Sequence, residues 1–239
     1  MTRATLDLIR DSLLTADPEP SAPAAWLFLL RDFIATGHPP TGDIVERGLT
    51  AALRLASADA DPCRRVQWVR LLAEAVLISD DPRLVQVVET SLPAAVDLLD
   101  ERVRGWFEPG EGLRGQSLEV HLAYANALLD AFDMTGRLPY STRADELVQL
   151  ARRHPAVQPG APEFSDLAAA DLLRALTRVQ KLHADPDYRA AVGREAGGMD
   201  TAESARLAEA FDGWRGDTRA AAHVGLALLG RFALGPDLQ

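Results

Sequence analysis

Two adjacent aromatic residues, Trp106 and Phe107, open a glycine-rich stretch that runs to Gly115. Side by side, they could form a flat apolar platform for a sugar ring or another small molecule. Aromatic residues next to glycine also often anchor a loop to the core, and that alternative stays open. Loops of this length inside compact domains are often functional. We therefore take Trp106 and Phe107 as candidate substrate-binding residues.

Three carboxylates, Glu108, Glu111 and Glu119, follow these aromatic residues. Two carboxylates that flank a bond can perform acid and base catalysis when their surroundings separate their pKa values. We take Glu119 as a candidate catalytic residue and Glu108 as a candidate substrate contact, although Glu108 and Glu111 also fit solvated loop charges. Arg114 could clamp an anionic group, but we favour its pairing with one of these acids.

His121 lies near the middle of the apolar arc of a helix that we expect over residues 117–135. A histidine in such a position is often a core residue with its hydrogen bonds satisfied. If it takes part in catalysis, it acts as a general acid or base, with a pKa set by Glu119 or Tyr124 nearby. Tyr124 and Asn126, on the same helix, are further candidate substrate contacts.

A second aromatic residue between glycines, Trp214, lies near the end of the chain, and we add it to the candidate substrate contacts. Convergence of Trp106, Glu119, His121 and Trp214 around one closed cavity would favour an enzyme. Their dispersal through the core beside a shallow groove would favour a binding scaffold.

Composition excludes several classes of function. The 239 residues carry a formal net charge of −10, which argues against a nucleic-acid surface or an anionic membrane as the partner. The single cysteine, Cys63, can form neither an intrachain disulfide nor a cysteine-based zinc site. The amino terminus shows no secretory signal and no apolar run is long enough to cross a bilayer, so we expect a cytoplasmic protein.

Sequence motifs predict no metal and no cofactor. Phosphate-binding loops, dinucleotide fingerprints and nucleophile elbows are absent from the sequence. The four histidines other than His121 lie mostly at loop or helix ends, and none has the paired helical spacing of a zinc site.

Apolar periodicity predicts helices along the whole chain. Asp-Pro pairs and Thr-Gly pairs mark their ends, with Ser21, Asp61 and Ser117 as N-caps and Pro93 as a kink or break. The expected helices cover residues 2–15, 21–36, 41–55, 61–79, 82–99, 117–135, 139–153, 164–182, 185–197, 200–211 and 218–229.

The turns between these helices recur about every 50 residues, which indicates a repeated two-helix hairpin. Such hairpins must stack to bury their apolar faces. An open array and a closed α/α toroid both remain compatible with about five hairpins. Helix 117–135 is apolar around most of its circumference, as an inner helix would be, with Glu119, Asn126, Asp130 and Asp133 on a narrow polar strip facing water or a cavity. We therefore expect one all-α domain over residues 1–239.

The combination of Trp106-Phe107, the glycine-rich loop, the helix containing residues 124–130, Thr135-Gly136 and Tyr140 resembles the six-hairpin α/α toroid superfamily. The N-acylglucosamine 2-epimerase-like proteins and the toroid domains attached to thioredoxin-like modules are the most similar members that we can name. The resemblance covers residues 103–153 and elsewhere only the repeat rhythm. This chain has about five hairpins where the family has six, and it contains no Cys-x-x-Cys.

The resemblance implies a carbohydrate-related protein with a small-molecule pocket, acting as an isomerase or a glycoside hydrolase-like enzyme on a sugar-like ligand. The alternative is a non-catalytic helical-repeat scaffold that binds a peptide or a protein partner. Homo-oligomer formation is compatible with both. Fold alone does not choose between them.

Overall fold

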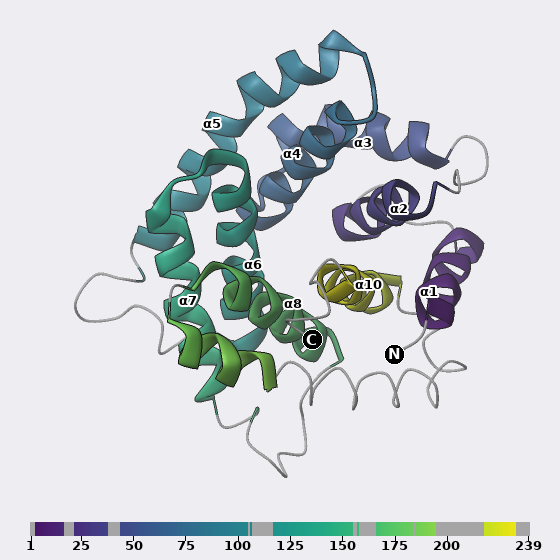
Figure 1. The fold of residues 1–239 in the computed structure, drawn as a ribbon. Helices are drawn as coiled ribbons and strands as arrows, with labels where there is room; N and C mark the ends of the chain where they lie inside the picture. The colour runs from purple at the N-terminus through teal and green to yellow at the C-terminus, as the bar shows by residue number, and fades with distance from the viewer. Residues whose placement is uncertain are drawn as a thin grey trace.

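The computed structural model describes residues 3–16, 22–37, 44–104, 106, 117–154, 157, 166–183, 185–194 and 218–232. These residues form helices and contain no strand, so the all-α prediction is confirmed for the part described (Figure 1). The helices are α1 (Arg3–Ala16), α2 (Pro23–Thr36), α3 (Ile44–Ala58), α4 (Pro62–Val76), α5 (Pro82–Arg104), α6 (Leu118–Thr135), α7 (Leu138–Arg152), α8 (Asp166–Leu182) and α10 (Thr218–Phe232). Residues 186–194 are also helical, whereas the expected helix at 200–211 lies outside the described residues.

Local signals in the sequence set the ends of these helices. The side chain of Asp61 accepts a hydrogen bond from the Arg64 backbone N–H at 2.8 Å and caps α4, and Ser117 caps α6 in the same way. Gly37 and Gly136 end α2 and α6 with φ of 66° and 67°, a left-handed conformation that glycine adopts without a Cβ penalty. The N-caps predicted at Asp61 and Ser117 are therefore confirmed, whereas α2 begins after Ala22 and not after the predicted cap Ser21.

Pro93 does not split its helix. Helix α5 runs without interruption from Pro82 to Arg104, past the predicted end near residue 99. Proline lacks the N–H that the helix interior needs, so it usually breaks or kinks a helix. Here the buried residues Ser91, Ala95 and Val96 hold the segment on either side of Pro93 against the neighbouring helices.

We expect replacement of Asp61 by alanine to lower the free energy of unfolding by about 1 kcal/mol, because the capping acceptor for α4 is lost. Chemical denaturation monitored by circular dichroism measures this change. Asp80→Ala, at an exposed position in the next turn, is the control and should change stability by less than about 0.5 kcal/mol. Equal effects of the two substitutions would contradict the capping role.

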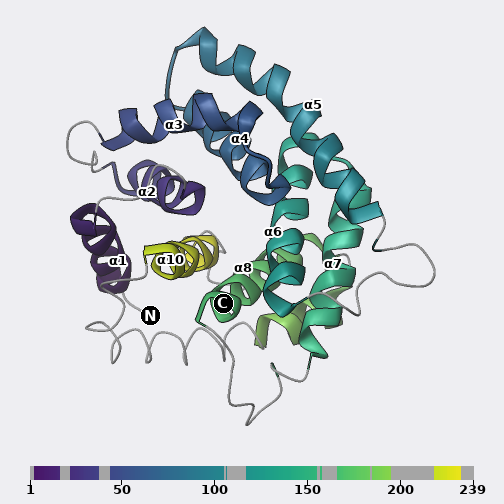
Figure 2. The same ribbon diagram turned by 180° about the vertical axis from the view of Figure 1, so that it is seen from behind.

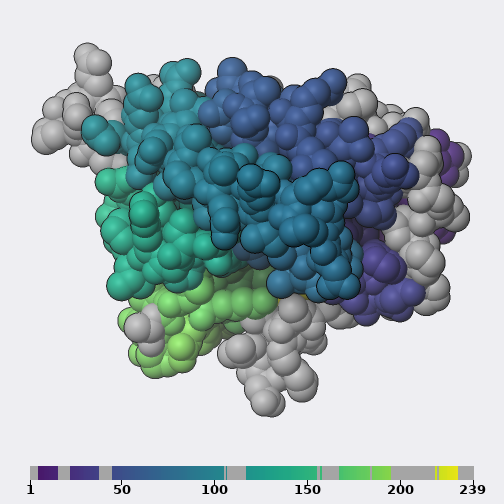
Figure 3. All heavy atoms as spheres, turned by 90° about the horizontal axis from the view of Figure 1, so that it is seen from above, coloured from purple at the N-terminus to yellow at the C-terminus, as the bar shows by residue number. Residues whose placement is uncertain are grey.

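The even-numbered helices contact one another in succession. Helix α2 packs on α4, α4 on α6, α6 on α8 and α8 on α10. Helix α10 also packs on α2 and α1, so the end of the described chain meets its beginning (Figures 1 and 2). The odd-numbered helices lie beside these: α3 and α5 pack on α4, and α7 packs on α6. Seen from above, α5 contributes much of the visible surface (Figure 3).

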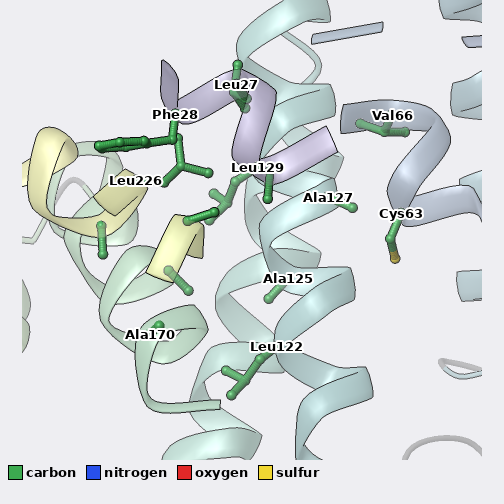
Figure 4. Packing of buried hydrophobic residues seen from close by; sticks show 14 of the residues in the cluster. Leu27, Phe28, Cys63, Val66, Leu122, Ala125, Ala127, Leu129, Ala170 and Leu226 are labelled. Atoms are coloured by element: carbon green, nitrogen blue, oxygen red, sulfur yellow. The ribbon is translucent and has the colours of Figure 1, made fainter. Parts of the chain in front are cut away.

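Buried apolar side chains from all these helices form one core cluster. In close view, Phe28 of α2 lies beside Leu226 of α10 (Figure 4). Helix α6 is buried along most of its length, at Leu118, His121, Leu122 and residues 125–131, as its sequence predicts. Its polar strip differs from expectation, because Asn126 and Asp130 are buried against α8 and only Glu119 and Asp133 are exposed.

Candidate functional site

Three of the predicted site residues lie together at the start of α6. The ring of Trp106 lies 4.3 Å from that of Tyr124, tilted by 56°, and 6.4 Å from that of His121 in an edge-to-face arrangement. His121 is buried and Tyr124 is half-buried. Burial raises the pKa of Tyr124 to about 12, so its hydroxyl stays protonated at neutral pH and gives up its proton less readily than an ordinary tyrosine.

Two further predicted site residues that the structure describes, Glu119 and Asn126, do not join this group. Glu119 is exposed, and two positions along a helix turn a side chain by about 200°, away from His121. Asn126 is buried, and its amide Nδ2 donates to the backbone carbonyls of Leu122 at 3.1 Å and Asp171 at 2.9 Å, which ties α6 to α8. The other predicted site residues fall outside the described part of the chain: Phe107, Glu108, Arg114 and Trp214.

A second polar site lies at the other end of α6. Asp130, with no exposed surface, lies between two arginines of α8: its carboxylate is 3.1 Å from Arg174 Nη2 and 3.0 Å from Arg178 Nη1. Burial alone would raise the pKa of Asp130, but the charges of Arg178 and Arg174 outweigh burial and hold the pKa at about 2. Asp130 is therefore ionised at neutral pH.

Glu74 of α4 likewise forms ion pairs with a second pair of arginines. Its carboxylate accepts hydrogen bonds from Arg31 Nε at 2.8 Å and from Arg70 Nε at 2.6 Å. Burial raises the pKa of Glu74, but hydrogen bonds and charge from Arg31 and Arg70 lower it overall. Arginine donates hydrogen bonds to carboxylates from a rigid, planar guanidinium group. This geometry suits ion pairs that are shared and partly buried.

Asp133 joins the two pairs into one network. Its carboxylate is 3.3 Å from Arg70 Nη1 and 2.9 Å from Arg178 Nη2. The connected residues come from α2, α4, α6 and α8, so the network holds four helices at one end of the fold. We name it the arginine network: Arg31, Arg70, Arg174 and Arg178 with Glu74, Asp130 and Asp133.

A pocket with a volume of about 330 Å³ opens against the arginine network. The residues that line it come from the C-terminal halves of α2, α4, α6, α8 and α10. They are Arg31, Ala35, Arg70, Asp133, Arg174, Thr177, Arg178, Lys181, Leu182, Leu226, Ala227, Leu229 and Gly230. None of the predicted site residues is among them, and Glu119 lies roughly 20 Å from Asp133 along α6.

Positive charge exceeds negative charge around this pocket. The four arginines and Lys181 face the three carboxylates of the network, which leaves an excess of two formal positive charges among the described residues. Helix C-termini carry partial negative charge, which favours cations here and offsets part of the excess. Lys181 uses this effect directly, since its Nζ donates to the Gly230 carbonyl at 3.1 Å.

Arg174 is the least satisfied of these cations. Its side chain is 2% exposed, and its Nε and Nη1 have no hydrogen-bond partner among the described residues. Burial lowers its pKa; Asp130 opposes this, and the nearby Arg178 and Arg31 add to the lowering. An unpaired buried donor loses its hydration without compensation, so such a group on a pocket wall favours an added acceptor.

A buried His–Asp pair lies in the N-terminal halves of α8 and α10. His223 Nδ1 is 2.5 Å from Asp171 Oδ1, and both side chains are at least nine-tenths buried. Asn126 donates to the backbone carbonyl of the same Asp171. His223 thus lies inside a helix, unlike His154 and His183, and it joins α10 to α8.

No family model, no curated protein and no solved structure matches this chain. The resemblance to α/α toroids and the carbohydrate-related function that it implies therefore remain predictions.

Among the described residues, no group of three or more histidine, cysteine, aspartate or glutamate side chains is placed to hold a metal ion. None of the described helices combines the length and the apolar character that crossing a bilayer requires.

Sequence reasoning missed the arginine network, although part of its signal is visible. Arg174, Arg178 and Lys181 follow the i, i+4, i+7 spacing of one helix face, and Asp130 and Asp133 follow the i, i+3 spacing. Either pattern alone fits a solvated helix surface. Only the packing of α6 against α8 shows that the two faces meet.

Proposed function

We propose that this protein binds a small anionic molecule in the pocket beside the arginine network. The observation that carries the proposal is Arg174, a buried guanidinium on the pocket wall with two nitrogen donors that have no partner among the described residues. A carboxylate or phosphate group would supply acceptors and negative charge together, in the geometry that arginine recognises well.

The excess of cations supports an anion over a neutral ligand. Five cations face three carboxylates, and these carboxylates already form ion pairs with the arginines that hold the helices together. No aromatic side chain is among the described lining residues, so these residues offer no stacking surface for a neutral sugar. Its volume of about 330 Å³ falls within the usual range for small-molecule sites.

Binding is a better-supported role for this pocket than acid–base catalysis. A carboxyl group serves as a general acid near neutral pH when its pKa is raised toward neutrality. Arginines instead lower the pKa of both Glu74 and Asp130. The predicted enzyme reading depends on Glu119 and His121 as catalytic residues, and both lie at the opposite end of α6 from this pocket.

We also propose that the inner helices form a closed ring, as in an α/α toroid of five hairpins. Support comes from the succession of contacts among α2, α4, α6, α8 and α10 and from the return of α10 to α2. All five helices contribute to the pocket, which would place it at one end of the ring axis.

Titration of the purified full chain with inorganic phosphate and with acetate, by calorimetry and by thermal shift, tests the anion proposal. We expect saturable binding that weakens as salt rises. Lys181→Glu should weaken binding by about tenfold or more, because it reverses a charge that lines the pocket. Lys181 is exposed, so we expect this variant to fold.

The matched control is Arg54→Glu, at an exposed position of α3 that does not line the pocket. It changes the net charge by the same amount, so it should leave binding unchanged within about twofold. Absence of binding by any small anion, or equal loss in both variants, would contradict the proposal. A neutral monosaccharide in the same screen tests the carbohydrate-related prediction separately.

A further inference from the structure

The walls of the pocket beside the arginine network differ sharply in character. Arg31, Arg70, Arg174 and Arg178 form the charged side. The other side is apolar and comes mostly from α10, through Leu226, Ala227, Leu229 and Gly230. A fully hydrated ion such as phosphate would satisfy the first side and leave the second in contact with water.

The apolar side continues to the surface of the protein. Leu182, at the end of α8, lines the pocket and is 41% exposed. Ala35 lines it from the end of α2, and the neighbouring Ile34 is 46% exposed. Large apolar side chains of this kind around a concave site commonly contact a ligand.

We infer that the ligand is a small amphipathic acid, with a carboxylate on the arginines and an apolar chain along α10 and Leu182. This inference depends on the proposed anion-binding function and narrows it to one ligand class. A pocket of about 330 Å³ lies within the range of small-molecule sites and is large enough for an acid with a chain of several carbons. A straight-chain acid of medium length has this size and this division of charge.

The chemistry at each end of such a ligand matches a described feature. The carboxylate provides acceptors for the partly exposed guanidinium groups of Arg31, Arg70 and Arg178 on the pocket wall. Its single negative charge reduces the excess of two formal positive charges without reversing it. The chain removes apolar surface of Leu182 and the half-buried Leu229 from water, and each buried methylene strengthens binding by up to about fourfold.

Calorimetric titration of the full chain with butyrate, hexanoate and octanoate tests the inference, with octan-1-ol and inorganic phosphate as reference ligands. We expect affinity to rise from butyrate to octanoate by roughly tenfold for each two methylenes. Octan-1-ol should bind much more weakly than octanoate, because it brings no charge to the arginines.

Two substitutions on the apolar side of the pocket test binding of the ligand's apolar chain separately from binding of its carboxylate. Leu182→Ser should weaken octanoate binding several-fold and leave phosphate binding unchanged. Leu229→Ala, at a half-buried position, provides the same readout if the first variant does not fold. Leu138→Ser is the control, since Leu138 is 71% exposed on α7 and does not line the pocket.

The outcomes separate the inference from the function on which it depends. If phosphate and butyrate bind as well as octanoate, the amphipathic ligand is excluded and the anion site stands. If octan-1-ol binds as well as octanoate, the carboxylate has no role and both proposals fail. Absence of binding by every ligand in the series also overturns both.

Discussion

Replacement of Asp130 by asparagine is expected to lower the free energy of unfolding at pH 7 by about 3–5 kcal/mol. Asp130 has no exposed surface, and its carboxylate balances the charges of Arg174 and Arg178. Removal of one partner from a buried ion pair leaves an uncompensated charge in the interior, which is strongly destabilising. Urea denaturation monitored by tryptophan fluorescence or circular dichroism measures the change.

Asp133→Asn is the matched control for this substitution. Asp133 also pairs with Arg178, but its side chain is 32% exposed. Water replaces part of the lost interaction there, so the expected loss is about 1 kcal/mol or less. Similar losses in the two variants would show that burial of Asp130 does not govern its contribution.

The pH dependence of Asp130→Asn provides an independent check. The pKa of Asp130 is about 2 in the folded protein, below the ordinary value of 3.8. A carboxyl with a lowered pKa stabilises the fold fully above its unfolded pKa and loses that contribution as pH falls through the folded pKa. The linked contribution is about 2 kcal/mol. The stability gap between wild type and variant should therefore narrow between about pH 4 and pH 2.

Replacement of Gly225 by alanine is expected to destabilise the protein by about 1–3 kcal/mol. A Cβ at this position would lie 2.5 Å from two ring carbons of Phe28, which has no exposed surface. The ring can withdraw only if the contact between α10 and α2 is repacked, and overpacking of a core costs energy of this order. Thermal and urea unfolding measure the loss.

Gly230→Ala is the control on the same helix. Its added Cβ would meet only Thr177 Cγ2, at an ordinary 3.7 Å. Alanine favours a helix interior over glycine by up to about 1 kcal/mol, so this variant should be unchanged or more stable. A Phe28→Leu substitution should reduce the penalty of Gly225→Ala. If Gly225→Ala is as stable as Gly230→Ala, helices α2 and α10 do not pack as described.

The sequence predicted local features of this fold well. Asp61, Ser117, Gly37 and Gly136 act within a few residues of their own position, through a hydrogen bond or a φ angle, so their effect is visible in a single sequence. Pro93 shows the limit of such reasoning. Its local tendency to break a helix is overcome by packing of the buried residues around it, which a local pattern does not reveal.

The candidate site was less predictable because it depends on contacts between hairpins. Asp130 was assigned to a polar strip facing water or a cavity, since no local signal indicates that Arg174 and Arg178 approach it from α8. The aromatic residues predicted to form a site do meet in part, at Trp106, His121 and Tyr124. The grouping of these three residues does not test the enzyme prediction. Four other residues of the predicted site lie outside the described part of the chain: Phe107, Glu108, Arg114 and Trp214.

The return of α10 to α1 and α2 has a consequence for synthesis of the chain. Helix α2 leaves the ribosome long before α10, so Phe28 is not covered until α10, far along the chain, has also emerged. Closure of so long a chain segment is slow compared with hairpin formation. A product truncated before α10 would therefore expose the apolar face of α2, and we expect it to be a target for chaperones and proteases.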